Sequence, residues 1–149
     1  MDPVIRTAVP DDLSRLHDLA VAFYEEDGFT TSAADLRANL ATLIGSPSAR
    51  VAVSESGGRL VAFGITTTTF GLESGLAAEL QDLFVAPEAR RRGEAERLIE
   101  DSARWAAAQG CTVLEIVIAP NGGDVGHLFG YYGRRGFRDE GRRMLSRPL

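Results

Sequence analysis

The stretch from Glu79 to Arg97, ELQDLFVAPEARRRGEAER, changes its apolar period midway and constrains the fold more than any other part of the chain. Its first half contains the β-prone apolar residues of a buried strand, which are Leu80, Leu83, Phe84 and Val85. From Ala95 to Ala106, apolar and small residues recur at helical spacing. The apolar run Thr112 to Ile118 then indicates a second buried strand. Strand, helix and strand in this order predict a βαβ unit whose two strands run parallel.

The junction between the first strand and the helix, Arg90-Arg91-Arg92-Gly93, combines three arginines with a glycine. It lies at a helix N-terminus, where backbone N–H groups lack intrahelical partners and the helix end is positive. Such a place binds anions, and the guanidinium groups add to the attraction. Gly93 also permits close approach of a ligand to the backbone. The junction therefore predicts a phosphate-binding site, the alternative being a glycine that merely begins a helix after a charged turn.

Three segments resemble those of one protein family. Arg90 to Ala95 resembles the R/Q-x-x-G-x-G/A signature of the GNAT superfamily of N-acetyltransferases, which bind acetyl-coenzyme A (acetyl-CoA). Leu80 to Pro87 is similar to the strand and turn before that signature, and Tyr132 to Phe137 is similar to the family's Y-x-x-x-G-F segment. The resemblance implies an α/β fold, with a mixed β-sheet flanked by helices and the βαβ unit as its cofactor-binding core.

The rest of the chain fits this architecture. Gly57-Gly58 predicts a hairpin turn, Thr31 or Ser32 can cap the second helix, and Asp124 can cap the last one. The Arg-rich tail after Phe137 is expected to form two final strands. Further strands are predicted at Val4–Ala8, Arg50–Ser54 and Arg59–Thr69, a turn at Phe70–Gly75, and helices at 10–27, 32–44 and 124–136. The expected order is β-α-α-β-β-β-α-β-α-β-β.

Length and composition favour one globular domain over residues 1–149, because 44% of the residues are hydrophobic and 25% are charged. No apolar run is long enough to span a membrane, and the N-terminus lacks the pattern of a secretion signal. We therefore expect a cytoplasmic protein with no membrane partner. A single cysteine, Cys111, and no HExxH pair argue against a disulfide and a metal site.

The charge distribution limits the classes of molecule that the protein is expected to bind. A net charge of −5 and the acidic run Glu25-Glu26-Asp27 argue against a nucleic-acid partner. The local arginine cluster at 90–92 suits a small phosphate group instead. A small cationic second substrate is compatible with the acidic remainder of the chain.

The family resemblance assigns the cofactor-binding residues. It implies that backbone groups of Leu83, Phe84 and Val85 hold the pantetheine arm and the thioester carbonyl of acetyl-CoA. Further cofactor contacts are implied for Arg90, Arg91, Arg92, Gly93 and Ala95 around the pyrophosphate and for Asn121 after the fifth strand. Glu94 departs from the family, which has an apolar residue there, and we expect its side chain to turn away and pair with Arg97 or Arg91.

Tyr132 matches the family tyrosine that protonates the leaving thiolate. A phenol suits this role because it is protonated at neutral pH and donates a hydrogen bond. Tyr132 also lies on the apolar stripe of its predicted helix, so a core position is the alternative. Tyr131 is the second candidate for the acid.

The base and the acceptor pocket are predicted from acidic residues. Some family members, notably polyamine acetyltransferases, have two acids in the segment that is Leu80 to Leu83 here, where this chain has Gln81 and Asp82. Asp82 can bind the ammonium group or accept its proton. Glu79 is the other candidate and is expected on the opposite face of the strand by alternation. The resemblance places the acceptor pocket near Tyr24, Glu25 and Glu26, with Gln81 as a further substrate contact.

The favoured function is an acetyl-CoA-dependent N-acetyltransferase that acts on a primary amine of a small cationic molecule, such as a polyamine or an aminoglycoside, by direct transfer in a ternary complex. One alternative is a cofactor-binding sensor that has lost catalysis, because Glu94 and Gln81 depart from the pattern. Another is acetylation of a protein lysine or N-terminus. The resemblance also implies a homodimer.

Overall fold

The computed structural model describes residues 2–119 and 123–149. The chain forms two compact units, Met1–Val117 and Ile118–Leu149, which are described separately below. No helix in the described part of the chain combines the length and the apolar character that crossing a bilayer requires.

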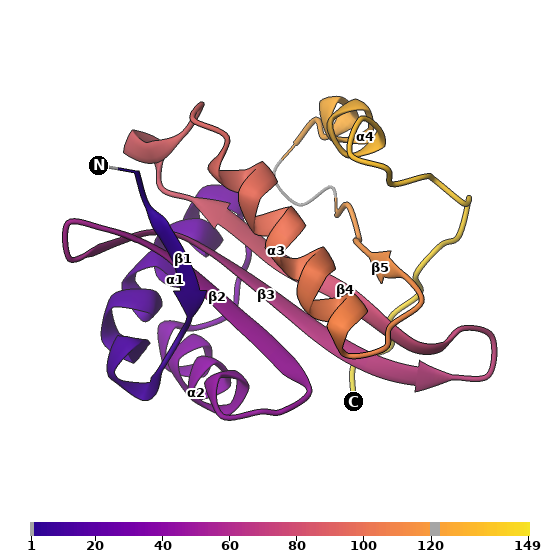
Figure 1. Ribbon diagram of the computed structural model, residues 1–149, viewed down its shortest axis with the longest axis horizontal. Helices are drawn as coiled ribbons and strands as arrows, with labels where there is room; N and C mark the ends of the chain where they lie inside the picture. Colours follow the sequence, from indigo (N-terminus) through magenta and orange to yellow (C-terminus); the bar gives the residue numbers. More distant parts are fainter. Residues whose placement is uncertain (1, 120–122) are drawn as a thin grey trace. The chain divides into compact units, whose positions relative to one another are not determined.

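The first unit is built on a mixed sheet whose strands follow the order β1-β2-β3-β4-β5 (Figure 1). Strands β1 to β4 pair antiparallel, and β4 pairs with β5 in parallel, which confirms the predicted βαβ unit. The elements of this unit are β1 (Val4–Thr7), η1 (Pro10–Asp12), α1 (Leu13–Asp27), α2 (Ala33–Ile44), β2 (Ala49–Ser56), β3 (Arg59–Gly71), β4 (Gly75–Val85), η2 (Pro87–Ala89), α3 (Glu94–Ala108) and β5 (Leu114–Glu115).

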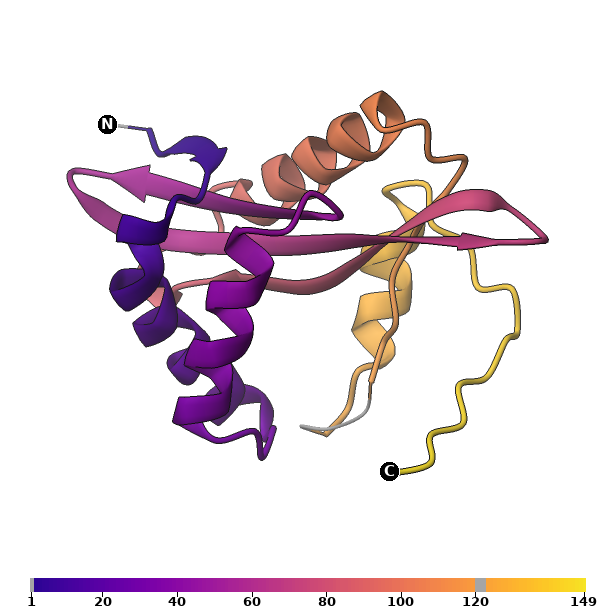
Figure 2. The ribbon, with the colours of Figure 1, turned by 90° about the horizontal axis from the view of Figure 1, so that it is seen from below.

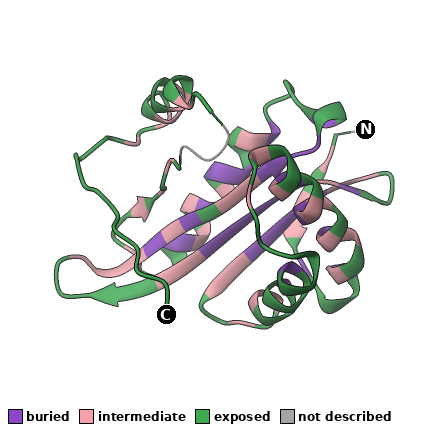
Figure 3. Cartoon of the chain, turned by 180° about the vertical axis from the view of Figure 1, so that it is seen from behind, coloured by how far each residue is buried: buried purple, intermediate pink, exposed green. Residues whose placement is uncertain are grey.

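Helices cover both faces of the sheet. Figure 2 shows α1 and α2 on one side of the strands and α3 on the other. Alternation along the strands supplies a core to each side, and buried residues follow the middle strands in Figure 3. The core under α1 centres on Phe23, which stacks on Phe84 with 5.1 Å between ring centroids. The smaller core under α3 contains Ala52, Ala62, Val85 and Leu98.

Strand β4 carries a β-bulge at Gln81. Ile65 pairs with Asp82 while Thr66 pairs with Leu80, so Gln81 is the extra residue on β4. A bulge breaks the alternation of side chains along its strand. If alternation is counted back from Asp82, each β4 side chain before Gln81 therefore lies on the face of the sheet opposite to the expected one.

Strand β5 is much shorter than the predicted Thr112–Ile118, because the regular strand comprises only Leu114 and Glu115. Just before it, the Thr112 N–H and the Val113 carbonyl oxygen also form hydrogen bonds with the β4 backbone. The partners of the regular strand are Ala78 and Glu79, so the pairing stops where β4 begins to bulge. Among the described residues, the edge of β4 from Asp82 to Val85 consequently has no strand partner on the β5 side.

Local signals account for the helix and strand ends. Ser32, rather than Thr31, caps α2, because its Oγ accepts a hydrogen bond from the Asp35 N–H at 3.1 Å. Helix α1 ends at Gly28, whose φ of 76° is left-handed. The β3–β4 connection is only the turn 72–74, shorter than the predicted Phe70–Gly75, because both strands extend further into the hairpin.

The second unit contains one helix, α4 (Gly126–Gly133), among its described residues. The N-cap residue is Val125 rather than the predicted Asp124, although Asp124 Oδ1, one residue earlier, accepts a hydrogen bond from the Gly126 N–H at 2.8 Å. The two strands expected after Phe137 are absent, since the described tail forms neither helix nor strand. Few of its side chains are apolar, and Met144 and Leu145 are exposed, so no strand face is buried.

A buried carboxylate joins the start of α1 to the sheet. Asp12, with 1% of its surface exposed, accepts hydrogen bonds from the Arg6 and Arg15 guanidinium groups at 2.8 to 2.9 Å and from the Val9 N–H at 2.8 Å. Glu55 pairs with the same two arginines. The pKa of Asp12 is held well below its usual range, chiefly by the Arg6 hydrogen bonds, although burial opposes the shift.

We expect Asp12→Asn to lower the free energy of unfolding by about 1–3 kcal/mol at pH 7, because two arginines lose a buried partner. A depressed pKa adds stability above the unfolded-state value of about 3.9, and that stability is lost as the pH falls toward the folded-state value. Urea unfolding at pH 7 and below pH 4 measures this, and the difference between wild type and variant should shrink in acid. The exposed neighbour Asp11 provides the control, Asp11→Asn, and an equal loss in both variants would contradict the prediction.

Candidate active site

The loop before α3 has the backbone shape of an anion cradle. Arg91 and Gly93 both adopt left-handed conformations, with φ of 65° and 78°, and Gly93 is the N-cap residue of α3. The N–H groups of the first helical turn have no intrahelical partners. A Cβ atom on Gly93 would meet no protein atom within 4 Å, so the space in front of the loop is open.

The three arginines of this loop differ in their contacts. Arg90 donates from Nε to the Val85 carbonyl oxygen at 2.8 Å and pairs through Nη2 with Glu26 at 2.7 Å. Its guanidinium also lies 5.4 Å from the centroid of the Phe84 ring. Arg90 thus ties the end of β4 to α1, while the side chains of Arg91 and Arg92 are exposed.

Glu94 is buried and points toward β2. Its Oε1 accepts a hydrogen bond from Ser54 Oγ at 2.5 Å, and its Oε2 pairs with Arg97 Nη1 at 2.9 Å. This arrangement agrees with the expected pairing with Arg97, and Arg91 is not the partner. The negative charge next to the loop is therefore paired inside the protein, which reduces its repulsion of a bound anion. Ala95, the last signature residue, packs against the core under α3.

The end of β4 presents its backbone, because its side chains are used in packing. Phe84 belongs to the core under α1, whereas Leu83 and Val85 pack in the core under α3. On the β5 side this part of the strand lacks a partner strand among the described residues. Backbone groups along that edge can bond a ligand, which is what the resemblance implies for Leu83 to Val85.

Glu79 and Asp82 lie on the same face of the sheet, so the prediction of opposite faces is wrong. Asp82 is opposite Ile65 of the core under α1, and Glu79 is opposite Thr67. Thr66, between these two β3 residues, faces α3 because its Oγ1 bonds Ser102 Oγ. The bulge at Gln81 is the physical reason, since an extra residue brings positions three apart to one face.

Asp82 lies half-buried and accepts a hydrogen bond at Oδ1 from the Tyr24 hydroxyl at 3.0 Å. Burial raises the pKa of Asp82, the Tyr24 hydrogen bond lowers it, and the charge of Glu79 raises it further. Burial, followed by the charge and hydrogen bonding of Asp82, raises the pKa of Tyr24 to about 12. Tyr24 is therefore a protonated donor at neutral pH. Burial disfavours the charged form of Asp82, and a cationic neighbour would stabilise that form.

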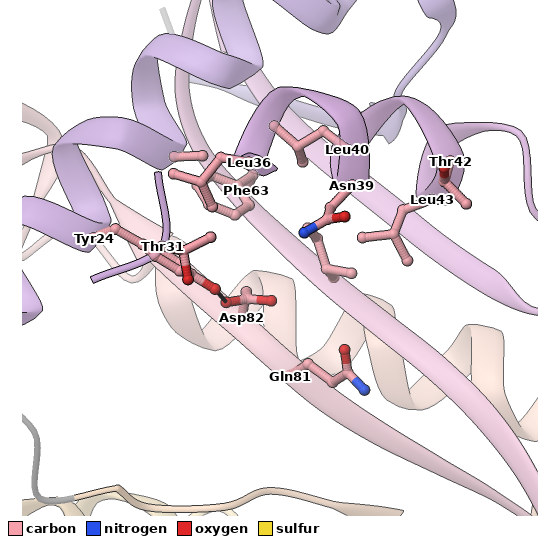
Figure 4. A pocket seen from close by; sticks show the side chains of 12 residues that line it. Tyr24, Thr31, Leu36, Asn39, Leu40, Thr42, Leu43, Phe63, Gln81 and Asp82 are labelled. Atoms are coloured by element: carbon pink, nitrogen blue, oxygen red, sulfur yellow. Dashed lines mark hydrogen bonds between the residues drawn. The ribbon is translucent and has the colours of Figure 1, made fainter. Parts of the chain in front are cut away.

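Asp82 and Tyr24 border a cavity of about 420 Å³ between the two N-terminal helices and strands β3 and β4 (Figure 4). Gln81 also lines it, so three of the predicted site residues meet there. Glu25 and Glu26 do not line it, since Glu25 is exposed and Glu26 pairs with Arg90. The lining is Ala20, Tyr24, Thr31, Leu36, Asn39, Leu40, Thr42, Leu43, Phe63, Ile65, Gln81 and Asp82.

Sequence reasoning missed the α2 wall of this cavity. In the sequence, Leu36, Leu40 and Leu43 recur at helical spacing, and such an apolar stripe is compatible with a purely structural core. Asn39 gave the available signal, because it places a polar amide next to that stripe.

Tyr132 lies on α4 in the second unit. Its ring contacts those of Tyr131 and Phe137, with centroids 5.1 and 5.6 Å away. Burial raises the pKa of Tyr132, the Tyr131 neighbour raises it further, and Arg135 opposes the shift. The Arg135 guanidinium covers the Tyr131 ring, 3.6 Å from its centroid. Asn121, a predicted cofactor contact, lies outside the described residues. Within the described ranges, no cluster of side chains is suited to a metal ion.

Comparison with known proteins agrees with this arrangement. The sequence matches the profile of the Acetyltransferase (GNAT) family over residues 13–137. The chain therefore belongs to the GNAT family and is an N-acetyltransferase whose acetyl donor is acetyl-CoA. Comparison with curated protein sequences finds no significant match.

Solved structures share the fold over nearly the whole chain. An integron cassette protein from the mobile metagenome of the Cole Harbour Salt Marsh is 27% identical, with a TM-score of 0.84 and coverage of 97% of this chain and 90% of that one. The aminoglycoside N-acetyltransferase AAC(6')-Iy, solved with CoA, is 19% identical, with a TM-score of 0.82 and coverage of 98% and 94%. An aminoglycoside 6'-N-acetyltransferase from Acinetobacter haemolyticus is 21% identical, with a TM-score of 0.80 and coverage of 98% and 99%.

We expect Glu94→Ala to lower the free energy of unfolding by about 1–3 kcal/mol, because Ser54 and Arg97 lose their shared buried partner. Thermal and urea unfolding measure the loss. Glu100→Ala, an exposed position on the same helix, is the matched control and should change stability little. Equal melting temperatures for Glu94→Ala and wild type would show that the buried carboxylate contributes nothing.

Proposed function

We propose that the enzyme transfers the acetyl group of acetyl-CoA directly to a primary amine of a small cationic molecule in a ternary complex. Polyamines and aminoglycosides are the acceptor classes that the sequence resemblance suggests. The observation that carries the proposal is the course of β4, which borders the cavity at Asp82 and leads into the loop at Gly93. Between them, from Asp82 to Val85, its β5 side has no strand partner among the described residues. One strand thus connects an acceptor cavity to a phosphate cradle.

The donor would be held along this edge and loop. Backbone groups of Leu83 to Val85 are assigned to the pantetheine arm and the thioester. The pyrophosphate is assigned to the turn formed by Arg91, Arg92 and Gly93 and to the first N–H groups of α3, including that of Ala95. Arg90 serves this site indirectly, because its side chain already bonds the Val85 carbonyl oxygen and Glu26.

The acceptor would enter as an ammonium ion paired with Asp82. Loss of one proton from nitrogen, to Asp82 directly or through water, frees the lone pair that attacks the thioester carbonyl carbon. The C–N bond forms as the C–S bond breaks, and the sulfur leaves as a thiolate with the bonding electron pair. The nitrogen is positively charged after the attack and releases its second proton to solvent, which balances the proton that the thiolate takes up. Tyr132 is assigned as the acid that protonates this thiolate. Glu79 shares the face of Asp82 and is the alternative base.

A small amine is favoured over a protein lysine, because the cavity is lined from α1, α2, β3 and β4. We also retain the proposal of a homodimer, which rests on the family resemblance.

The donor site is tested with Gly93→Glu, in which a carboxylate and its stem enter the cradle. We expect calorimetry to show CoA binding weakened by at least ~10-fold, with a matching loss of thiol release from acetyl-CoA. Gly58→Glu is the control, because Gly58 has φ of 77° and an equally open Cβ direction, so the backbone strain is alike. If the wild type binds neither CoA nor acetyl-CoA, or if both variants lose binding equally, the assignment of the cradle is wrong.

The acid is tested with Tyr132→Phe, which retains the ring and removes only the hydroxyl. We expect kcat to fall by roughly 10- to 1,000-fold, while CoA binding and the melting temperature stay near those of the wild type. Tyr131→Phe is the adjacent control and should retain activity. Full turnover in a folded Tyr132→Phe enzyme would exclude Tyr132 as the acid, and loss in Tyr131→Phe alone would assign the role to Tyr131.

A further inference from the structure

The cavity at Asp82 has an unusual balance of charge and apolar surface for a site that takes cations. Among its described lining residues, Asp82 is the only charged one. The other polar side chains of the lining, apart from Tyr24, are neutral, namely the amides of Gln81 and Asn39 and the hydroxyls of Thr31 and Thr42. A polycation would bring further ammonium groups into this space without carboxylates to receive them.

The wall opposite Asp82 carries three leucines beside the neutral polar groups of Asn39 and Thr42. Figure 4 shows Leu36, Leu40 and Leu43 on the α2 side of the cavity, with Gln81 and Asp82 on β4. Phe63 and Ile65 extend the apolar surface along β3. A bound molecule whose nitrogen meets Asp82 would therefore place the rest of its body against leucine side chains.

The other acids of this region lie outside the cavity lining. Glu79 follows on the same face of β4 toward the hairpin, and its charge acts on Asp82, but it does not line the cavity. Glu26 is already paired with Arg90. Glu79 therefore strengthens the negative potential at Asp82, and neither acid offers the cavity a second anchoring point.

We infer that the acceptor is a primary amine with a single ammonium group on an apolar body, such as an alkylamine or an arylalkylamine, rather than a polyamine or an aminoglycoside. This inference rests on the proposed function and narrows its acceptor class. Asp82 holds the ammonium group, Tyr24 orients the carboxylate through its hydroxyl, and the leucines of α2 select an apolar body. Gln81 sets specificity, since a neutral amide there withholds the second counter-charge.

The test compares amines that differ in one property. Hexylamine and 1,6-diaminohexane have the same six-carbon chain, but the diamine replaces the terminal hydrogen with a second ammonium group. With acetyl-CoA and a thiol-release assay, hexylamine should have a kcat/KM at least ~10-fold above those of 1,6-diaminohexane and neamine. In the series ethylamine, butylamine and hexylamine, kcat/KM should rise by ~3-fold for each methylene that the leucines bury.

Two variants then test whether an added negative charge changes the acceptor preference only when it lies in the cavity. Gln81→Glu should shift the ratio of kcat/KM for the diamine over hexylamine upward by ~10-fold, because it adds the missing counter-charge. Gln109→Glu, the same change at an exposed residue beyond the cavity lining, should leave the ratio unchanged. Asp82→Asn should reduce kcat/KM for hexylamine by ~100-fold, since the ammonium group loses its partner.

The outcomes are distinguishable. A wild-type preference for 1,6-diaminohexane or neamine would overturn this inference and leave the proposed function standing. An unchanged ratio in Gln81→Glu would likewise overturn it, because Gln81 would then not face the acceptor. Binding of acetyl-CoA without thiol release for any of these amines would overturn the proposed function and the inference together.

Discussion

The β-bulge at Gln81 is the constraint on which the arrangement of this site depends. It places Glu79 and Asp82 on one face of β4, although they are three residues apart. Leu80 and Leu83 meet on the other face for the same reason, and a Cβ atom on Gly64 would lie 3.8 and 3.9 Å from their Cδ1 atoms. The bulge also coincides with the end of the β4–β5 pairing, which leaves the strand edge used in the proposed donor site. One extra residue thus shapes the acceptor side and the donor side together.

The loop after β4 has exposed positive groups that can attract an anion, while its other charged side chains are paired within the protein. Arg90 and Glu94 are both engaged in contacts within the protein, the first with Val85 and Glu26, the second with Ser54 and Arg97. Exposed guanidinium groups and the backbone remain available at the surface of the loop. The ion pairs of Arg90 and Glu94 thus flank the left-handed turns at Arg91 and Gly93.

Much of this structure could be predicted from the sequence, and the exceptions have physical causes. The βαβ unit and the cap at Ser32 follow from local periodicity and turn chemistry, which act over a few residues, whereas phosphate binding by the loop at Gly93 stays a prediction. The faces of Glu79 and Asp82 were mispredicted because alternation assumes regular pairing, and a bulge depends on the partner strand. The α2 wall was overlooked, since a leucine stripe such as Leu36 to Leu43 has the same pattern whether it fills a core or borders a cavity.

Because of the bulge, changing the number of residues in β4 has a different effect on its pairing with β3 from changing their identity. A substitution at Gln81 alters one exposed side chain, whereas deletion of that residue would restore regular pairing with β3. Every side chain from Gly75 to Leu80 would then change faces: Glu79 would turn into the apolar layer beneath α3, and Leu80 would leave it. A substitution at this position leaves the pairing of β3 and β4 intact, whereas a change in residue count there would require rebuilding half of the hairpin.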